Sequence, residues 1–151
     1  MSFSTYLENE VMSASAGKLV VMLYDGAINF LKRLDNLDYH TNLETKTYNI
    51  NKAYAILTEL QVSLNFEYKE ISDRLFSLYT YMQRRLMEAN IENNPEHVKE
   101  VIIMLKDLRE TWSEAVTSEN KKNAVNRLQA QIETEPVKDG DETAESFSIA
   151  C

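Results

Sequence analysis

The side chains that could do chemistry in this sequence are few: two histidines, His40 and His97, a single cysteine, Cys151, and 24 acidic residues. A di-iron site in a helical bundle needs Glu-x-x-His on two facing helices, but Leu37 and Asn94 stand three positions before the histidines. A zinc site shared by the two histidines would need two more ligands, which the sequence does not indicate. We therefore expect no metal and no other cofactor.

Nucleophilic catalysis has no better candidate. Cys151 is the last residue and has no histidine near it in the sequence, and no glycine-rich phosphate-binding loop occurs. A single cysteine cannot form an internal disulfide, which agrees with a reducing compartment. The sequence therefore predicts a protein that is not an enzyme. A metal-dependent bundle enzyme is the alternative, which metal analysis of the purified protein would test.

Composition narrows the class of protein further. The 151 residues suffice for one domain, and three glycines and two prolines leave little turn chemistry for a sandwich or a barrel. A net charge of −8 disfavours nucleic acid and anionic membranes as partners. No apolar stretch is long enough to span a membrane, and the first residues lack the pattern of a secretory signal. We expect a cytoplasmic protein without membrane insertion.

Apolar residues at steps of three, four and seven predict four long helices. The first begins near Ser15 and carries the apolar line Leu19, Leu23, Gly26/Ala27, Phe30, Leu34 and Leu37. The second opens with a capping box from Thr41 to Glu44, and its stripe is Leu43, Ile50, Ala53, Leu57, Leu60 and Leu64. The third carries Ile71, Leu75, Leu78, Met82, Leu86 and Ala89. The fourth begins at Asn94-Pro95 and carries Val98, Val101/Ile102, Leu105, Leu108, Trp112 and Ala115.

Short joints between such helices predict an all-α fold, an antiparallel up-down four-helix bundle. Val125, Leu128 and Ile132 predict a short additional C-terminal helix, either continuous with the fourth helix or folded back. We expect a flexible N-terminal arm over residues 1–14, a bundle domain over 15–133, and an acidic disordered tail over 134–151.

More apolar and amphipathic side chains occur than four core stripes can take. They are Val20, Val21, Phe76, Tyr79, Tyr81, Met87, Ile91, Ile103 and Met104. The surplus predicts an apolar groove on the outside of the bundle, which suits an amphipathic helix of another protein. The alternative is that these residues cover the fifth segment or a homodimer face.

Three stretches of the sequence, in order, carry a family resemblance. The first is Val11-Met-Ser-Ala-Ser-Ala-Gly-Lys-Leu19 with Met22-Leu-Tyr-Asp-Gly-Ala27. The second is Leu64 to Glu70 followed by Leu78-Tyr-Thr-Tyr-Met-Gln-Arg-Arg-Leu-Met-Glu-Ala-Asn90, and the third is Leu105-Lys-Asp-Leu-Arg-Glu-Thr-Trp112. Together, over about residues 6 to 117, they resemble the flagellar export chaperone family FliS. Ala16 stands where the family usually has proline, and the usual Gly-Gly is missing after Lys69.

The resemblance implies a cytoplasmic chaperone that binds the disordered C-terminal segment of flagellin. It would prevent premature polymerisation and deliver flagellin to the flagellar type III export apparatus. The resemblance implies the export gate protein FlhA as a second partner. The free protein would be a monomer or a weak dimer. The alternative is a self-associating structural or regulatory helical bundle of flagellar assembly, which a size measurement at micromolar concentration would separate from the chaperone.

The resemblance also points to particular residues. The flagellin-binding groove would be lined by Leu78, Tyr79, Met82, Arg85 and Leu86, with Leu57, Leu60 and Leu64 as the opposing wall. Four of these residues also lie on the core stripes, so simple core packing is the alternative for Leu57, Leu64, Leu78 and Met82. The N-terminal arm would contribute Val11, Ser13, Ala14 and Ser15, which can occupy part of the groove, and Tyr6, which would serve guest release and export docking.

Overall fold

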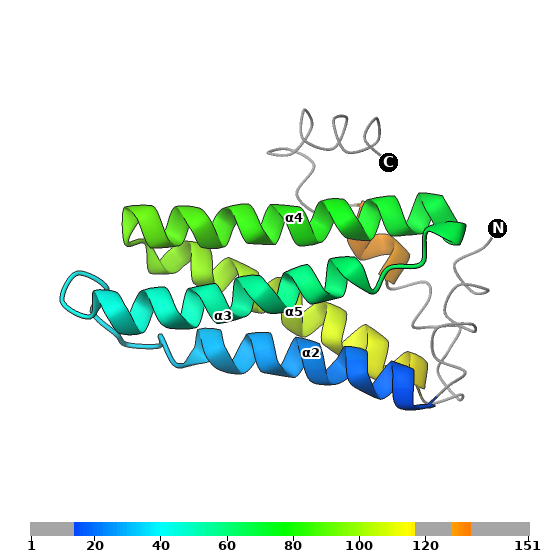
Figure 1. The fold of residues 1–151 in the computed structure, drawn as a ribbon, viewed down its shortest axis with the longest axis horizontal. Coiled ribbons are helices and arrows are strands. Elements are labelled where there is room, and N and C mark those ends of the chain that lie inside the picture. Colours follow the sequence, from blue (N-terminus) through cyan, green and yellow to red (C-terminus); the bar gives the residue numbers. More distant parts are fainter. Residues whose placement is uncertain (1–13, 117–127, 134–151) are drawn as a thin grey trace.

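The computed structural model describes residues 14–116 and 128–133, and its helices form an antiparallel four-helix bundle (Figure 1). The helices are α2 (Ala14–Lys32), α3 (Leu43–Val62), α4 (Lys69–Glu92) and α5 (Pro95–Val116), with the 3-10 turn η1 (Phe66–Tyr68) between α3 and α4. Each helix packs against the next one in the chain, and α5 packs against α2, so the four enclose one core. The predicted all-α bundle is confirmed.

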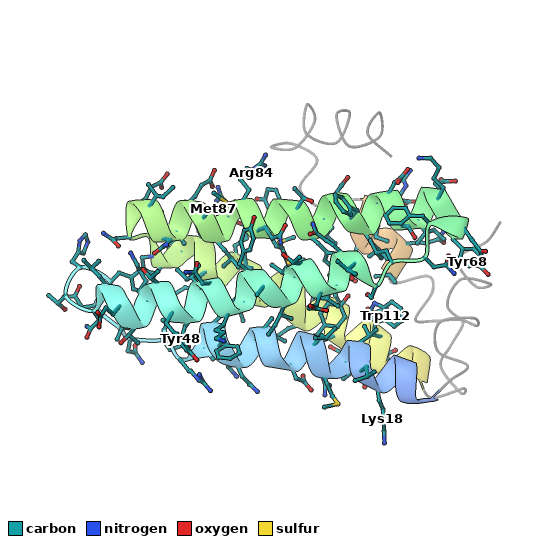
Figure 2. All side chains as sticks on the ribbon, viewed as in Figure 1. Lys18, Tyr48, Tyr68, Arg84, Met87 and Trp112 are labelled. Carbon is teal, nitrogen blue, oxygen red and sulfur yellow. The ribbon has the colours of Figure 1, made fainter. Side chains whose placement is uncertain are left out.

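The apolar positions predicted for α4 all face the core, and so do those of α5 as far as Trp112. Figure 2 shows Trp112 pointing into the bundle, whereas Lys18 points away from it. The predicted start of α5 is also confirmed, because the Asn94 side chain accepts a hydrogen bond from the Glu96 amide at 2.9 Å. Pro95 is the first residue of the helix, where its missing amide hydrogen costs no hydrogen bond.

The predicted stripe of α3 is buried only in its middle. Ile50 and Leu57 are in the core, whereas Leu43 is half exposed and Leu64 is partly buried. A strict seven-residue repeat drifts around a straight helix by about 20° per heptad, so residues three heptads apart cannot share one narrow core face. The predicted capping box was wrong, since the N-cap is Asn42 and its side chain makes no cap hydrogen bond.

The predicted core line of α2 was wrong at Leu19, whereas Ala27 and Leu34 are in the core and Leu23 and Leu37 pack against it. The buried face of α2 carries Gly17, Tyr24, Ala27, Ile28 and Leu31. By contrast, 59% of the surface of Leu19 is exposed, and Leu23 and Phe30 are partly buried. The helix is apolar along two neighbouring stripes, and periodicity alone does not say which of them faces inward.

Two asparagines lie in the joints between α2 and α3 and between α4 and α5, at one end of the bundle, which we call the far end. Asn36 and Asn93 have φ angles of 62° and 54°, in the left-handed region that glycine usually occupies at helix ends. Asn93 is the C-cap of α4. Asparagine tolerates this conformation better than most residues, so a chain with few glycines can still turn sharply between helices.

A buried lysine ties α3 to this joint. Lys46 is 3% exposed, and its ammonium group donates hydrogen bonds to the Asn90 carbonyl at 2.8 Å and to the Asn93 side chain. Burial lowers the pKa of Lys46. A cation at the C-terminal carbonyls of α4 is favourable because the helix dipole is negative there.

The short helix at residues 128–133 folds back onto the bundle, which is one of the two arrangements that the sequence left open (Figure 1). Leu128 and Ile132 belong to the core. Val125, the arm before residue 14 and the tail after residue 133 lie outside the described residues.

The centre of the bundle holds a pair of tyrosines. The hydroxyls of Tyr24 on α2 and Tyr79 on α4 are 2.6 Å apart, and both side chains are buried. Burial raises the pKa of Tyr79 well above its usual value, and the Tyr24 phenol adds to the shift. The Tyr79 phenol is therefore neutral at physiological pH, and one of the two hydroxyls donates its hydrogen to the other.

We predict that Tyr79→Phe lowers the free energy of unfolding by about 1 to 2 kcal/mol, the usual cost of losing a buried hydrogen bond. Because Tyr24→Phe removes the same bond, the double variant should lose less than the sum of the two single losses. Urea unfolding measures all three. Tyr48→Phe is the control, since the Tyr48 side chain is half exposed. Strictly additive losses would contradict the coupling of the two phenols.

Candidate partner-binding surface

The structure places most of the predicted groove residues in the interior. Six of them are at most 3% exposed: Leu57, Leu60, Leu78, Tyr79, Met82 and Leu86. Leu64 and Arg85 are partly buried. In this state the six line no open surface, and they pack between α3, α4 and the rest of the core. Their contact with a guest stays a prediction, and it would require α3 and α4 to separate.

The outer edge between α3 and α4 is closed by polar hydrogen bonds. Gln61 donates to the Thr80 hydroxyl at 2.9 Å, and Gln83 donates to the Thr58 hydroxyl at 2.9 Å. Near the far end, the Thr47 hydroxyl donates to the Asn90 side chain at 3.0 Å. These bonds join α3 to α4 above the buried groove candidates, although Val62 and Met87 are exposed one turn away from them.

Arg85 belongs to an ion-pair network with α5. Its guanidinium group donates to Glu100 at 2.9 Å and to Glu88 at 2.8 Å, and the Tyr81 hydroxyl donates to Glu100 at 2.6 Å. Burial by itself raises the pKa of Glu100, but the hydrogen bonds from Tyr81 and Arg85 and the charge of Arg85 outweigh it and leave this pKa below its ordinary value. Arg85 therefore holds α4 to α5 in the free chain.

Most of the residues predicted for the N-terminal arm are not described by the structure. Tyr6, Val11 and Ser13 lie outside the described residues. Ala14 and Ser15 form the first turn of α2, so the helix begins one residue before the predicted start.

An open apolar surface lies instead along the edge between α2 and α3. On α2, Leu19, Met22, Gly26 and Phe30 follow one another at steps of three and four, so they share one face of the helix. Gly26 and Phe30 place this face against α3: a Cβ atom at Gly26 would be 3.3 Å from Cδ1 of Ile56, and the ring of Phe30 meets Tyr48 edge-on at 6.4 Å. We call this surface the α2/α3 strip: Leu19, Met22, Leu23, Gly26, Phe30, Tyr48 and Ile56.

The strip is exposed and apolar in its composition. Leu19, Met22 and Tyr48 are 59%, 64% and 54% exposed, and Figure 2 shows Tyr48 at the edge between α3 and α2. Because Gly26 has no side chain, Ile56 of α3 lies directly against α2 there, and the strip is flat at its middle. A monomeric protein rarely exposes such a continuous apolar surface without a partner for it.

Cationic groups flank one end of the α2/α3 strip. The guanidinium group of Arg33 lies 4.6 Å from the centre of the Phe30 ring, and the ammonium group of Lys52 lies 5.4 Å from the centre of the Tyr48 ring. Both geometries are favourable cation-π contacts. In a chain of net charge −8, this end of the strip is locally basic.

The prediction missed the strip because Leu19 and Phe30 were assigned to the core. The signal was present in the sequence: α2 has apolar residues on the face of Tyr24 and Ala27 and again on the face of Leu19 and Met22. A helix in a four-helix bundle can bury only one face, so one of the two had to lie at a surface.

The other exposed apolar side chains among the described residues are spread over the bundle: Leu43 and Val62 on α3, Phe66 in η1, Met87 and Ile91 on α4, and Ile103 on α5. Met87 and Ile91 lie one turn apart on α4, and Figure 2 shows Met87 with Arg84 on its outer side. Ile103 is exposed on α5, between the exposed charged residues Lys99 and Asp107. The expected external apolar residues Met87, Ile91 and Ile103 are confirmed, whereas Tyr79, Tyr81 and Met104 are buried.

A hollow of about 380 Å³ lies at the far end of the bundle, lined by Leu34, Asp35, Asn36, Leu37, Tyr39, Pro95, Val98 and Lys99. Tyr39 is 3% exposed, and burial, followed by the nearby charge of Asp35, raises its pKa to about 12. Within residues 14–116 and 128–133, no three His, Cys, Asp or Glu side chains gather in a way that could hold a metal ion. None of the described helices is long and apolar enough to cross a membrane.

Comparison with known proteins identifies the family. The chain matches the family model of the flagellar protein FliS over residues 2–119. It is 35% identical to the flagellar secretion chaperone FliS of Bacillus subtilis over 119 residues, which are 79% of this chain and 89% of the relative. For the corresponding chaperone of Escherichia coli the identity is 38% over 114 residues, 74% of this chain and 84% of the relative. The chain belongs to the FliS family.

The FliS match covers the whole bundle. It includes α2 and α3 with the α2/α3 strip, and it ends at residue 119, before the short helix at 128–133. The expected family membership is therefore confirmed, and the helix at 128–133 lies beyond the matched part.

We predict a loss of stability at alkaline pH that depends on Tyr39. In the unfolded chain its phenol ionises at the ordinary value of 10.0, whereas in the fold it keeps its proton up to about 12. The stabilisation is therefore complete below pH 10 and is lost as the pH rises to about 12. Tyr39→Phe removes the titrating group, so wild type should lose about 2 kcal/mol more than the variant across this window, since each pKa unit is worth about 1.4 kcal/mol. Urea unfolding over this range measures the difference, and parallel pH curves would contradict the prediction.

Proposed function

We propose that this chain is a flagellar secretion chaperone that holds the C-terminal segment of flagellin before export, and that the segment binds along the α2/α3 strip. Membership of the FliS family supports the role. The apolar surface of the strip supports the place, because Leu19, Met22 and Tyr48 are exposed on it, whereas hydrogen bonds or ion pairs cross the other edges.

The shape of the strip suits an amphipathic helix. A guest helix laid along the edge of two antiparallel helices needs apolar side chains at steps of three and four, and the strip presents Leu19, Met22, Gly26 and Phe30 at the same steps. The absent side chain at Gly26 lets Ile56 of α3 lie against α2, which keeps the middle of the strip flat for a guest helix. Met22 can adapt its flexible side chain to different guests.

The charges near the strip favour one orientation of the guest. Arg33 and Lys52 stand beside Phe30 and Tyr48, near the start of α3. A guest segment with carboxylates toward that end would gain favourable contacts, while the net negative charge of the chain repels guests that are acidic throughout.

The proposed role requires no catalysis. Flagellin segments that are disordered before assembly lose conformational entropy when they bind, which offsets part of the gain from apolar burial and keeps binding reversible. The chaperone would then pass the guest to the export gate protein FlhA, with Tyr6 as the residue for guest release and docking. Tyr6 lies outside the described residues, so this step depends on the family resemblance alone.

We predict that Met22→Asp weakens binding of a flagellin C-terminal fragment. Met22 is 64% exposed, so the substitution leaves the core intact, but it puts a charge where the guest would bury apolar surface. The dissociation constant should rise by about tenfold, equivalent to about 1.4 kcal/mol. Isothermal titration calorimetry measures the constant, and circular dichroism checks that the helical content is unchanged.

Ile103→Asp is the matched control. Ile103 is 62% exposed on α5 and lies outside the strip, so the same charge there should leave the dissociation constant unchanged. Equal losses in both variants would remove the strip as the seat of the guest. Light scattering separates the rival role: a monomer that forms a one-to-one complex supports the chaperone, and a self-associated protein that ignores flagellin supports a structural bundle.

A further inference from the structure

The helix at 128–133 is a short amphipathic segment that fills a groove of its own chain. Leu128 is fully buried and Ile132 is 9% exposed, four positions further along, whereas Gln129, Ala130 and Glu133 are exposed. One side of this helix, with its two apolar side chains, therefore faces the bundle and the other faces solvent. Figure 1 shows the segment in orange, next to α4.

The groove that it fills lies between α4 and α5. Glu100, Met104 and Thr111 share one side of α5, and Glu100 bonds to Tyr81 and Arg85 of α4, so this side borders α4. The Thr111 hydroxyl lies 3.5 Å from Oε1 of Gln131, which places the segment at the end of this groove away from Arg85. Thr111 and Met104 are 0% and 6% exposed.

The α4/α5 edge has room for such an insert. Of the four neighbouring helix pairs of the bundle, α4 and α5 are the least closely packed. At one end of the edge, Arg85 and Glu100 hold the helices together. At the other end, Leu128 and Ile132 complete the core.

The segment lies beyond the part of the chain that matches the family model, because that match ends at residue 119. The described part of this helix is held on the bundle by only two apolar side chains, Leu128 and Ile132. Binding of this kind can be displaced by a longer helix.

We infer that the α4/α5 groove is a second guest-binding surface and that residues 128–133 act as a built-in competitor for it. The occupant that displaces the segment is an amphipathic helix of the same flagellin fragment, with apolar residues four positions apart like Leu128 and Ile132. The inference rests on the proposed function. It assigns the segment at 128–133 a regulatory role. The empty chaperone covers its own groove with this segment, and a bound guest releases it.

Hydrogen exchange on the full-length chain tests the displacement directly. When a flagellin C-terminal fragment saturates the protein, the amides of residues 128–133 should exchange faster than in the free protein. Exchange that stays unchanged or becomes slower would overturn the inference, because the segment would then be a fixed part of the fold. If wild type and all variants fail to bind the fragment, the proposed function falls and this inference falls with it. Binding without faster exchange removes only the competitor.

Variants of the full chain give a second readout. Leu128→Asp with Ile132→Asp should free the groove and lower the dissociation constant of the fragment by about three- to tenfold, because a site that is open for only a fraction of the time loses affinity by that fraction. Gln129→Asp places the same charge on the exposed side of the segment and should leave the constant unchanged. Should the double variant unfold, Leu128→Ala with Ile132→Ala is the milder form. Affinity that stays the same or weakens in a folded variant would overturn the inference.

Discussion

The hydrogen bond between Tyr24 and Tyr79 is the constraint on which the rest of this bundle depends. It joins α2 to α4, two helices that do not follow one another in the chain, across the centre of the core. A buried hydroxyl without a partner is costly, so each phenol must point at the other. This fixes the rotation of α2 about its own axis, and the face of α2 with Leu19 and Met22 is thereby turned outward, toward the edge with α3.

The four edges of the bundle are closed by different chemistry, and this difference decides where a partner can bind. The guanidinium group of Arg109 donates two hydrogen bonds to the Asp25 carboxylate at the α2/α5 edge, and Arg85 binds Glu100 at the α4/α5 edge. The α3/α4 edge carries hydrogen-bonded amides and hydroxyls such as that of Gln83 with Thr58. Apolar and aromatic side chains line the α2/α3 strip, and Arg33 and Lys52 make cation-π contacts at one end of it. A surface of this kind suits a chaperone, because its work is reversible burial.

Periodicity predicted the elements well and the surfaces poorly. For α4 and α5 each apolar stripe is matched by a polar opposite face, so positions such as Leu75 and Leu105 could be assigned to the core. α2 has two apolar stripes, and the prediction assigned Leu19 to the core although it lies on the exposed stripe. The predicted groove around Tyr79 failed as an open surface for a related reason. Residues on adjacent helices can line a groove or a core with the same spacing. Only their burial in the folded structure distinguishes the two.

The sequence alone determined the four helices, the joint at Asn94-Pro95, the lack of an evident catalytic site and the resemblance to FliS, because these follow from local spacing, capping and residue type. Tertiary packing decided which stripe of α2 is outside, how Lys46 is buried and where Leu128 and Ile132 bind. The physical reason is that local interactions set the period of a helix, whereas its rotation about its axis is set by the partners it meets across the core.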